Sequence, residues 1–200
     1  MRALALIALF ALTAGPAAAY EPTGNAIADT LLRAVEQAGY ADASVASAQR
    51  DGESLVLTEL SGGGASSGKA VRIGRATITE PVVNADNELL ASAVAYEDVV
   101  ISDGSGDPTA TIGAVRLTDV RLPGITPDMP QTSDFLGDFE SIAVDALTAR
   151  SPEGEEISFD AMRAALATRD DGTEAGEIAL TGLVFALDLF EEPDRYQLKR

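Results

Sequence analysis

Short apolar segments alternate with clusters of turn-forming residues along most of the chain. From Val45 onward, stretches rich in Val, Ile and Thr are separated by Gly-, Asp- and Pro-containing breaks at 50–52, 61–68, 84–87, 103–108, 152–154 and 169–172. β-Branched residues between such breaks are typical of strands. The pattern predicts a mainly β fold, an antiparallel meander of about seven to nine strands that forms a curved sheet or an open barrel.

One segment ahead of these strands has the periodicity of a helix. Between Asn25 and Ala38, apolar side chains recur at positions 27, 31, 32 and 35, and polar residues fill the opposite face. Asn25 can cap the first turn, and Gly39 can end the helix in a left-handed conformation. We expect an amphipathic helix that packs against the sheet. The alternative, a helix lying on a membrane surface, requires a basic face, which this segment lacks.

Apolar residues within several predicted strands fall five positions apart: Ile73 and Ile78; Ile112, Leu117 and Leu122; Ile142 and Leu147. Because strand side chains alternate, an odd interval places successive residues on opposite faces. Either each strand contains a bulge, which Gly74 or Gly113 would allow, or both faces of the sheet are partly covered.

Eight apolar residues are candidates for one shared apolar face, and we expect them to be largely buried: Ile73, Ile78, Ile112, Leu117, Ile142, Leu147, Ile178 and Leu183.

A loose four-residue motif also recurs in the predicted strands. Leu57-Thr58-Glu59-Leu60 is echoed by segments that begin at Ile78, Tyr96, Leu117, Leu147 and Leu180, at intervals of 21, 18, 21, 30 and 33 residues. About one strand and one turn would fill each shorter interval. The alternative is coincidence among Thr-rich strands.

The first 19 residues have the features of an export signal. Arg2 precedes an apolar run, and Pro16 comes before the small residues Ala17 and Ala19 that a signal peptidase requires. We expect cleavage after Ala19, which leaves Tyr20 as the new amino terminus. An uncleaved membrane anchor is the alternative, but this apolar run is about half of the roughly 20 residues needed to span a bilayer. A periplasmic or secreted chain without a transmembrane segment is therefore expected.

Charge and composition exclude several functions. The chain has 32 acidic and 14 basic residues, which repels nucleic acid. It contains neither Cys nor His, which excludes disulfides, Ser-His-Asp triads, Cys nucleophiles and ordinary zinc or copper sites. We therefore expect no enzyme activity and no cofactor, although a hydrolase that uses a carboxylate pair stays open.

Several short segments match part of a known binding or catalytic motif but lack other residues that the motif requires. Residues 63–69 match Gly-x4-Gly-Lys, but Ala70 replaces the hydroxyl residue of a phosphate-binding loop and strand residues follow. Ser66-x-x-Lys69 lacks the partner motifs of penicillin-recognising enzymes. Asp103 to Asp107 suggests a calcium loop, but its twelfth position is Ala114 rather than Glu, so a tight turn explains it equally well. Adjacent carboxylates at 155–156, 170–171 and 191–192 lie in hydrophilic, turn-like stretches.

The long connection Pro123–Gly137 could subdivide the chain, but a single β-rich domain at 20–200 is expected. The segments IGRATITEPVV, IGAVRLTDVRLPG and FESIAVDALTARSPEGEEISFDAM resemble the strand repeats of AsmA-like envelope proteins. The resemblance implies a long, curled sheet that offers an apolar groove to lipid chains. It covers about residues 70–190, and this chain departs from the family in its small size and lack of an anchor.

Together these features predict a non-enzymatic envelope protein that binds an apolar or lipid-like ligand along a β surface. The alternative is a structural or interaction module that docks a basic protein partner through its acidic surface or an unprotected sheet edge.

Overall fold

The computed structural model describes residues 22–37, 40, 42–64, 68–103, 105–122, 138–151, 154–168 and 174–185. Within these residues, one helix precedes ten strands: α1 (Ala26–Gln37), β1 (Ser44–Asp51), β2 (Ser54–Gly64), β3 (Lys69–Thr79), β4 (Val82–Val83), β5 (Leu89–Asp103), β6 (Pro108–Leu122), β7 (Ser141–Arg150), β8 (Glu156–Thr168), β9 (Glu174–Thr181) and β10 (Val184–Phe185).

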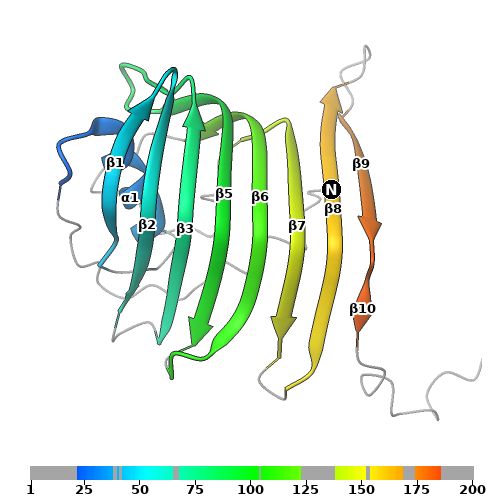
Figure 1. Cartoon of the computed structure of the whole chain (residues 1–200). Helices are drawn as coiled ribbons and strands as arrows, with labels where there is room; N and C mark the ends of the chain where they lie inside the picture. Colours follow the sequence, from blue (N-terminus) through cyan, green and yellow to red (C-terminus); the bar gives the residue numbers. More distant parts are fainter. Residues whose placement is uncertain are drawn as a thin grey trace, which may run out of the picture.

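All of these strands belong to one antiparallel sheet with the order β1-β2-β3-β5-β6-β7-β8-β10. The short β4 pairs with β5, while β9 and β10 both pair with β8. Figure 1 shows the strands side by side in chain order, with β1 at one end and β9 and β10 at the other. The predicted mainly β fold, a helix followed by an antiparallel meander, is confirmed. The sheet is open and curved, since the strands at its two ends do not pair with each other.

The predicted break at 123–137 lies outside the described residues. The strands on either side of it, β6 and β7, pair directly from Ala110↔Ala149 to Thr118↔Ser141. The sheet is therefore continuous across this point in the sequence.

Two lines of bends cross the sheet perpendicular to the strands. The first bend line contains residues that lie opposite one another in register: Glu59, Gly74, Asp98, Gly113, Ala146, Asp160 and Gly182. Glu59, Asp98, Ala146 and Gly182 have left-handed backbone angles, with φ between 51° and 67°. They alternate with Gly74, Gly113 and Asp160, which do not appear among the residues with positive φ.

The second bend line lies six residues away along every strand that it crosses. It contains Glu53, Glu80, Ser92, Asp119, Glu140, Leu166 and Gly176. Its left-handed residues are Glu80 (φ 50°), directly after β3, and Asp119 (φ 48°) of β6; both strands have an ordinary backbone at the first line.

The bends explain the five-residue apolar spacing. The alternation of side chains restarts on the far side of the first bend line, both on strands with a left-handed residue there and on β3, whose Gly74 has an ordinary backbone. On β3, Val71, Ile73, Ala76 and Ile78 are all buried, and the interval of three spans Gly74. One of the two explanations left open by the sequence is a bulge at Gly74 or Gly113, and the irregularity does lie at these residues. However, the pairing register is the same on both sides of each bend, so no extra residue is inserted. The apolar residues consequently share one face.

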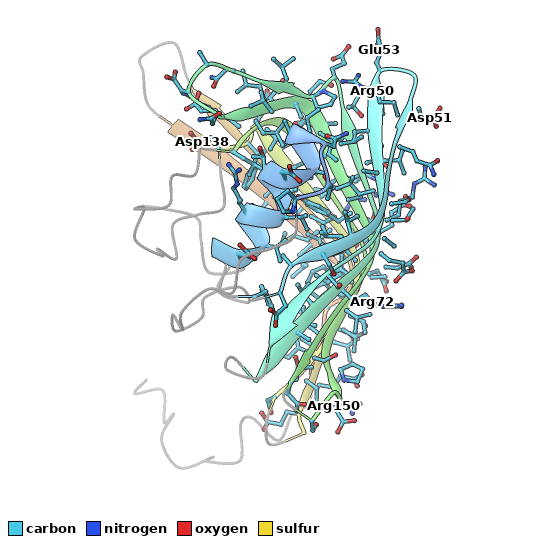
Figure 2. All side chains as sticks on the ribbon, turned by 90° about the vertical axis from the view of Figure 1, so that its left-hand side faces the viewer. Arg50, Asp51, Glu53, Arg72, Asp138 and Arg150 are labelled. Atoms are coloured by element: carbon cyan, nitrogen blue, oxygen red, sulfur yellow. The ribbon has the colours of Figure 1, made fainter. Side chains whose placement is uncertain are left out.

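That face, the inner face, is the one on which α1 packs. Figure 2 shows α1 beside one face of the curved sheet. Ile27, Leu31 and Leu32 of α1 join the same buried cluster as Leu55 and Ile78 of the sheet. Asn25 caps the helix as predicted, because its Oδ1 accepts hydrogen bonds from the backbone N–H groups of Ile27 (3.1 Å) and Ala28 (3.2 Å). The predicted end at Gly39 lies outside the described residues.

Ala146→Gly should stabilise the protein. Ala146 is the one alanine among the described residues with positive φ (53°), and its side chain is exposed. A left-handed backbone costs about 1–2 kcal/mol in an L-residue, which exceeds the roughly 0.5–1 kcal/mol that glycine loses in backbone entropy. We expect the free energy of unfolding, measured by urea denaturation, to rise by about 0.5 kcal/mol. In the control Ala143→Gly, on the same strand with an ordinary backbone, it should fall; a fall in both variants would show that the bend is not strained.

Candidate binding face

The inner face changes from buried to exposed along single rows of the sheet. The first inner row runs from β2 to β9 through residues that lie opposite one another: Leu55, Ile78, Val94, Leu117, Ile142, Ala164 and Ile178. Ile78 has no exposed surface, whereas Ile178 is 63% exposed. Both are isoleucines on the same face, so position along the sheet decides their exposure.

Two further inner rows show the same gradient. In the second row Leu57 of β2 is fully buried, and Leu180 of β9 is 42% exposed. In the third row Ile73 is 8% exposed, and Leu183, which the register places opposite Phe159, is 48% exposed. Ile157 of β8, on the same face, is 42% exposed. These four residues form the terminal apolar patch, defined as Ile157, Ile178, Leu180 and Leu183.

The eight candidates for an apolar face therefore divide into three groups. Ile73, Ile78, Ile112 and Leu147 are buried, as expected. Leu117 and Ile142 are half-buried and pack against the buried cluster. The expected burial is wrong for Ile178 and Leu183, because they lie on and directly after β9, at the end of the sheet, where β8 is the single described partner strand. The middle and helix-covered strands therefore form a core, and the open part of the inner face is confined to the last strands.

Sequence reasoning did not single out Ile157 and Leu180. A usable signal existed, because Ile178, Leu180 and Leu183 repeat the intervals of two and three that separate Val94, Tyr96 and Val99 on β5. Reading that signal required knowing that Gly182, like Asp98, is a bend.

The outer face of the sheet is polar and is connected by ion pairs. Asp145 of β7 accepts hydrogen bonds from Arg163 of β8 (2.6 Å) and from Arg116 of β6. Both bonds hold the pKa of Asp145 below its usual value, and the bond from Arg163 has the larger effect. Glu88 accepts a bidentate contact from Arg121 (2.7 and 2.9 Å), which with a bond from Asn84 lowers the pKa of Glu88. The charges of Arg116, Arg121 and Arg163 are thus neutralised locally on this face.

No known protein family, curated protein or solved structure matches this chain.

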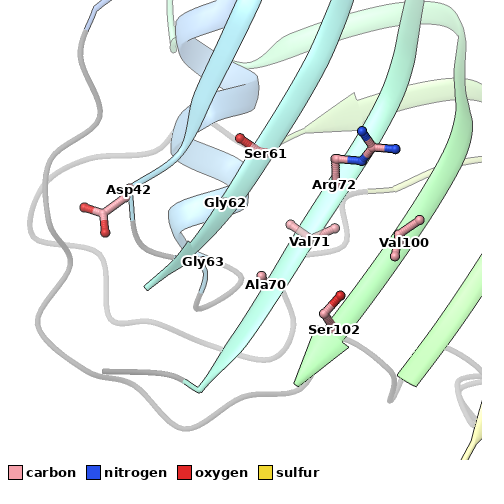
Figure 3. Close-up of a pocket in the computed structure, with 9 residues that line it drawn as sticks. All are labelled: Asp42, Ser61, Gly62, Gly63, Ala70, Val71, Arg72, Val100 and Ser102. Carbon is pink, nitrogen blue, oxygen red and sulfur yellow. The ribbon is translucent and has the colours of Figure 1, made fainter. Parts of the chain in front are cut away.

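A shallow pocket of about 280 Å³ lies where β2 and β5 end and β3 begins, and Gly63 of the Gly-x4-Gly-Lys segment lines it. Figure 3 shows Gly63 and Ala70 on its wall, with Ser61, Arg72 and Ser102 nearby. Arg72 pairs with Glu59 (3.2 Å), and the Ser61 hydroxyl lies 3.0 Å from that of Ser44. The residues after Lys69 continue as β3 rather than as a helix, so no helix amino terminus faces the pocket from this segment. Ser66 lies outside the described residues.

The suggested calcium loop forms the turn between β5 and β6. Asp103 Oδ1 accepts hydrogen bonds from the backbone N–H (2.8 Å) and the hydroxyl (2.5 Å) of Ser105, and these bonds lower the pKa of Asp103. The backbone N–H of Asp103 also donates to the carbonyl oxygen of Asp107 (3.0 Å). These bonds explain the acidic residues as parts of a tight turn.

The structure brings together one carboxyl pair that sequence reasoning missed. Asp119 and Glu140 are neighbours on the second bend line, and a hydrogen bond that protonated Glu140 donates to the Asp119 carboxylate raises the pKa of Glu140. Both side chains are exposed. Of the carboxylates expected in turns, Glu156 pairs with Arg150 (3.2 Å), and those at 170–171 and 191–192 lie outside the described residues. Across the described residues, no three acidic side chains are grouped as metal ligands would be.

The described part of the chain contains no helix with the length and apolar character needed to cross a membrane. Ala17, Ala19 and Tyr20, at the expected cleavage site, lie outside the described residues.

Proposed function

We propose that this protein is an exported, non-enzymatic envelope protein that binds an apolar or lipid-like ligand along the inner face of its sheet, at the terminal apolar patch. Export follows from the features of residues 1–19, and a periplasmic or secreted location from export. The echoes of Leu57-Thr58-Glu59-Leu60 are, in this view, repeats of a strand unit that extends the binding surface.

One observation carries the proposal: the apolar rows of the core continue onto strands where they face solvent. Ile178, Leu180 and Leu183 keep the spacing of core residues but are 63%, 42% and 48% exposed. Contiguous exposed apolar surface on a protein is a mark of ligand or partner binding. Ile178 and Leu183 are five residues apart, which corresponds to about 16 Å along a strand. A surface of this length suits an extended hydrocarbon chain better than a compact polar molecule.

The alternative, docking of a basic protein through an acidic surface, has weaker support from the outer face. Six arginines project from it among the described strands: Arg72, Arg75, Arg116, Arg121, Arg150 and Arg163. They lie among carboxylates of opposite sign, so this face is not a uniformly acidic field that would steer a basic partner.

Two variants with matched exposure test the proposal. Ile178 and Val184 are both 63% exposed, but Ile178 is on the inner face, whereas Val184 lies opposite Ser158 on the outer face. Ile178→Asp should weaken binding of a fluorescent fatty acid, measured by titration, by about tenfold or more, because it removes about 1.5–3 kcal/mol of apolar burial. Val184→Asp should leave the affinity within about twofold.

Native mass spectrometry of protein purified from the periplasm without detergent should also reveal co-purifying lipid. Equal weakening by both variants, or no binding of fatty acid or envelope lipid by the natural protein, would contradict the proposal.

A further inference from the structure

The edge formed by β9 and β10 lacks the protection that exposed sheet edges usually carry. β9 pairs with β8, and none of the described strands pairs with its other side. The segment EAGEIALT contains no Pro and no Lys, the residues that most commonly block edge pairing, and its charged residues are Glu174 and Glu177. Its described inner-face side chains, Ile178 and Leu180, are apolar and exposed. An edge of this kind is a template for another strand.

The two bend lines determine which strand fits this edge. They cross the edge at Gly176 and at Gly182, and Ala179 lies midway between them. An antiparallel strand continues both lines only if it carries bends six residues apart and is centred opposite Ala179. A second copy of the same edge meets this requirement, because a twofold axis through Ala179 places Gly182 of each copy opposite Gly176 of the other.

The alternation of backbone conformation also continues in that arrangement. Across the first bend line, a left-handed residue on one strand faces a residue with ordinary backbone on the next, as Asp98 faces Gly113. Gly182 is left-handed (φ 67°), and Gly176 is not among the residues with positive φ. Each pairing of Gly182 with Gly176 of the second copy therefore places a left-handed residue opposite an ordinary one, as on the first bend line within the sheet.

Side-chain chemistry favours the same register. Centring on Ala179 places Ile178 opposite Leu180 of the second copy on the inner face, twice by symmetry. On the outer face Glu177 lies opposite Thr181, and Ala179 lies opposite its own equivalent. A register centred on Glu177 would instead place two carboxylates directly opposite each other, which is destabilising. A register centred on Ile178 or Leu180 would move both bend lines out of alignment.

We propose that two copies of this protein pair through β9 and β10 around a twofold axis at Ala179. The pair forms one continuous sheet across which both bend lines continue. The inner rows of the two copies then join, so that their terminal apolar patches become one surface across the dimer. Pairing of β9 with itself closes after two copies, whereas pairing of β9 with β1 of another copy would produce an open fibre.

Sedimentation of the purified, lipid-free protein should show a concentration-dependent species with twice the mass of one chain, which is 20.7 kDa for all 200 residues. Ala179→Lys should shift this species to one chain, because two ammonium groups would face each other, while thermal unfolding by circular dichroism verifies that the exposed substitution leaves the fold intact. A single-chain mass at every concentration would overturn the proposal.

Cysteine substitutions test the register, since the chain contains no natural Cys. Under mild oxidation Ala179→Cys should form a disulfide-linked dimer, because directly opposite Cβ atoms lie about 4.5–5.5 Å apart. Glu177→Cys alone should not crosslink, since its own equivalent lies about 13 Å away along the partner strand. A mixture of Glu177→Cys and Thr181→Cys chains should crosslink. Crosslinking of Glu177→Cys as readily as Ala179→Cys would refute this register.

These outcomes are independent of lipid binding. A lipid-free dimer that binds no fatty acid would support the pairing and contradict the proposed function, and a monomer that binds fatty acid would do the reverse.

Discussion

Ile78→Ala should lower the free energy of unfolding by about 2–5 kcal/mol, the largest effect that we expect from a single substitution. Ile78 has no exposed surface and lies between Leu55 and Val94 in the first inner row, where neighbouring strands and bends hold the backbone in place. The surrounding chain cannot collapse to fill the space, so the cavity adds to the lost transfer free energy. Chemical denaturation followed by far-ultraviolet circular dichroism measures the change; the chain contains no Trp.

Ile178→Ala is the matched control, since it makes the same chemical change in the same row. Ile178 is 63% exposed, so in dilute solution its truncation should cost less than about 1 kcal/mol. Similar losses at both positions would mean that the inner face near β9 is as well covered as the middle of the sheet. That result would also remove the basis for a binding surface there.

Gly62→Ala should destabilise the docking of α1 by about 1–3 kcal/mol. A Cβ atom at Gly62 would lie 2.6 Å from Cγ1 of Val35 and 3.0 Å from Cβ of Tyr40, closer than carbon atoms approach without movement. Gly62 is not among the glycines with positive φ, so its backbone is compatible with alanine and steric overlap is the cause of the loss. Replacing glycine also reduces the entropy of the unfolded chain, which offsets about 0.4–1 kcal/mol of the cost.

A double-mutant cycle isolates this contact. Val35→Ala removes the overlapping methyl group, so the double variant Val35→Ala/Gly62→Ala should lose less stability than the two single losses combined. Strict additivity in urea denaturation would show that α1 does not pack tightly over Gly62.

The sequence predicted the elements whose formation depends on residues close together in the chain. The cap at Asn25 and the apolar stripe of α1 predicted the helix, because both depend on residues within a few positions of each other. Turn clusters between β-branched segments predicted the meander, because consecutive strands in this sheet are neighbours in space.

The bends could not be inferred with the same ease. The five-residue spacing of Ile73 and Ile78 was visible, but the sequence left two explanations open, since a left-handed backbone is uncommon in any residue other than glycine. Five of the six four-residue segments have a left-handed residue at their third position: Glu59, Glu80, Asp98, Asp119 and Gly182. The segment at Leu147 does not conform, since its left-handed residue is Ala146, one position before the segment begins.

The terminal apolar patch escaped sequence analysis for a different reason. Ile178 and Ile78 occupy equivalent positions in apolar segments, and both were expected to be buried. What separates them is the place of their strands in the sheet: β3 lies between β2 and β5, whereas β9 pairs with β8 alone among the described strands, and this is a property of how distant elements are placed. Local pattern identifies the face of a strand but not what covers that face.

The alternating bends also restrict how this architecture can change in length. On the first line the left-handed residues belong to β2, β5 and β7 and include Gly182 directly after β9, and on the second line they are Glu80, directly after β3, and Asp119 of β6. Two consecutive strands are therefore needed before the backbone pattern repeats. Gain or loss of a single strand would place two left-handed residues side by side. Gain or loss of a two-stranded hairpin would keep left-handed and ordinary residues alternating along the bend lines. Relatives of this protein should accordingly differ in size by whole hairpins, with the positions of both bend lines preserved.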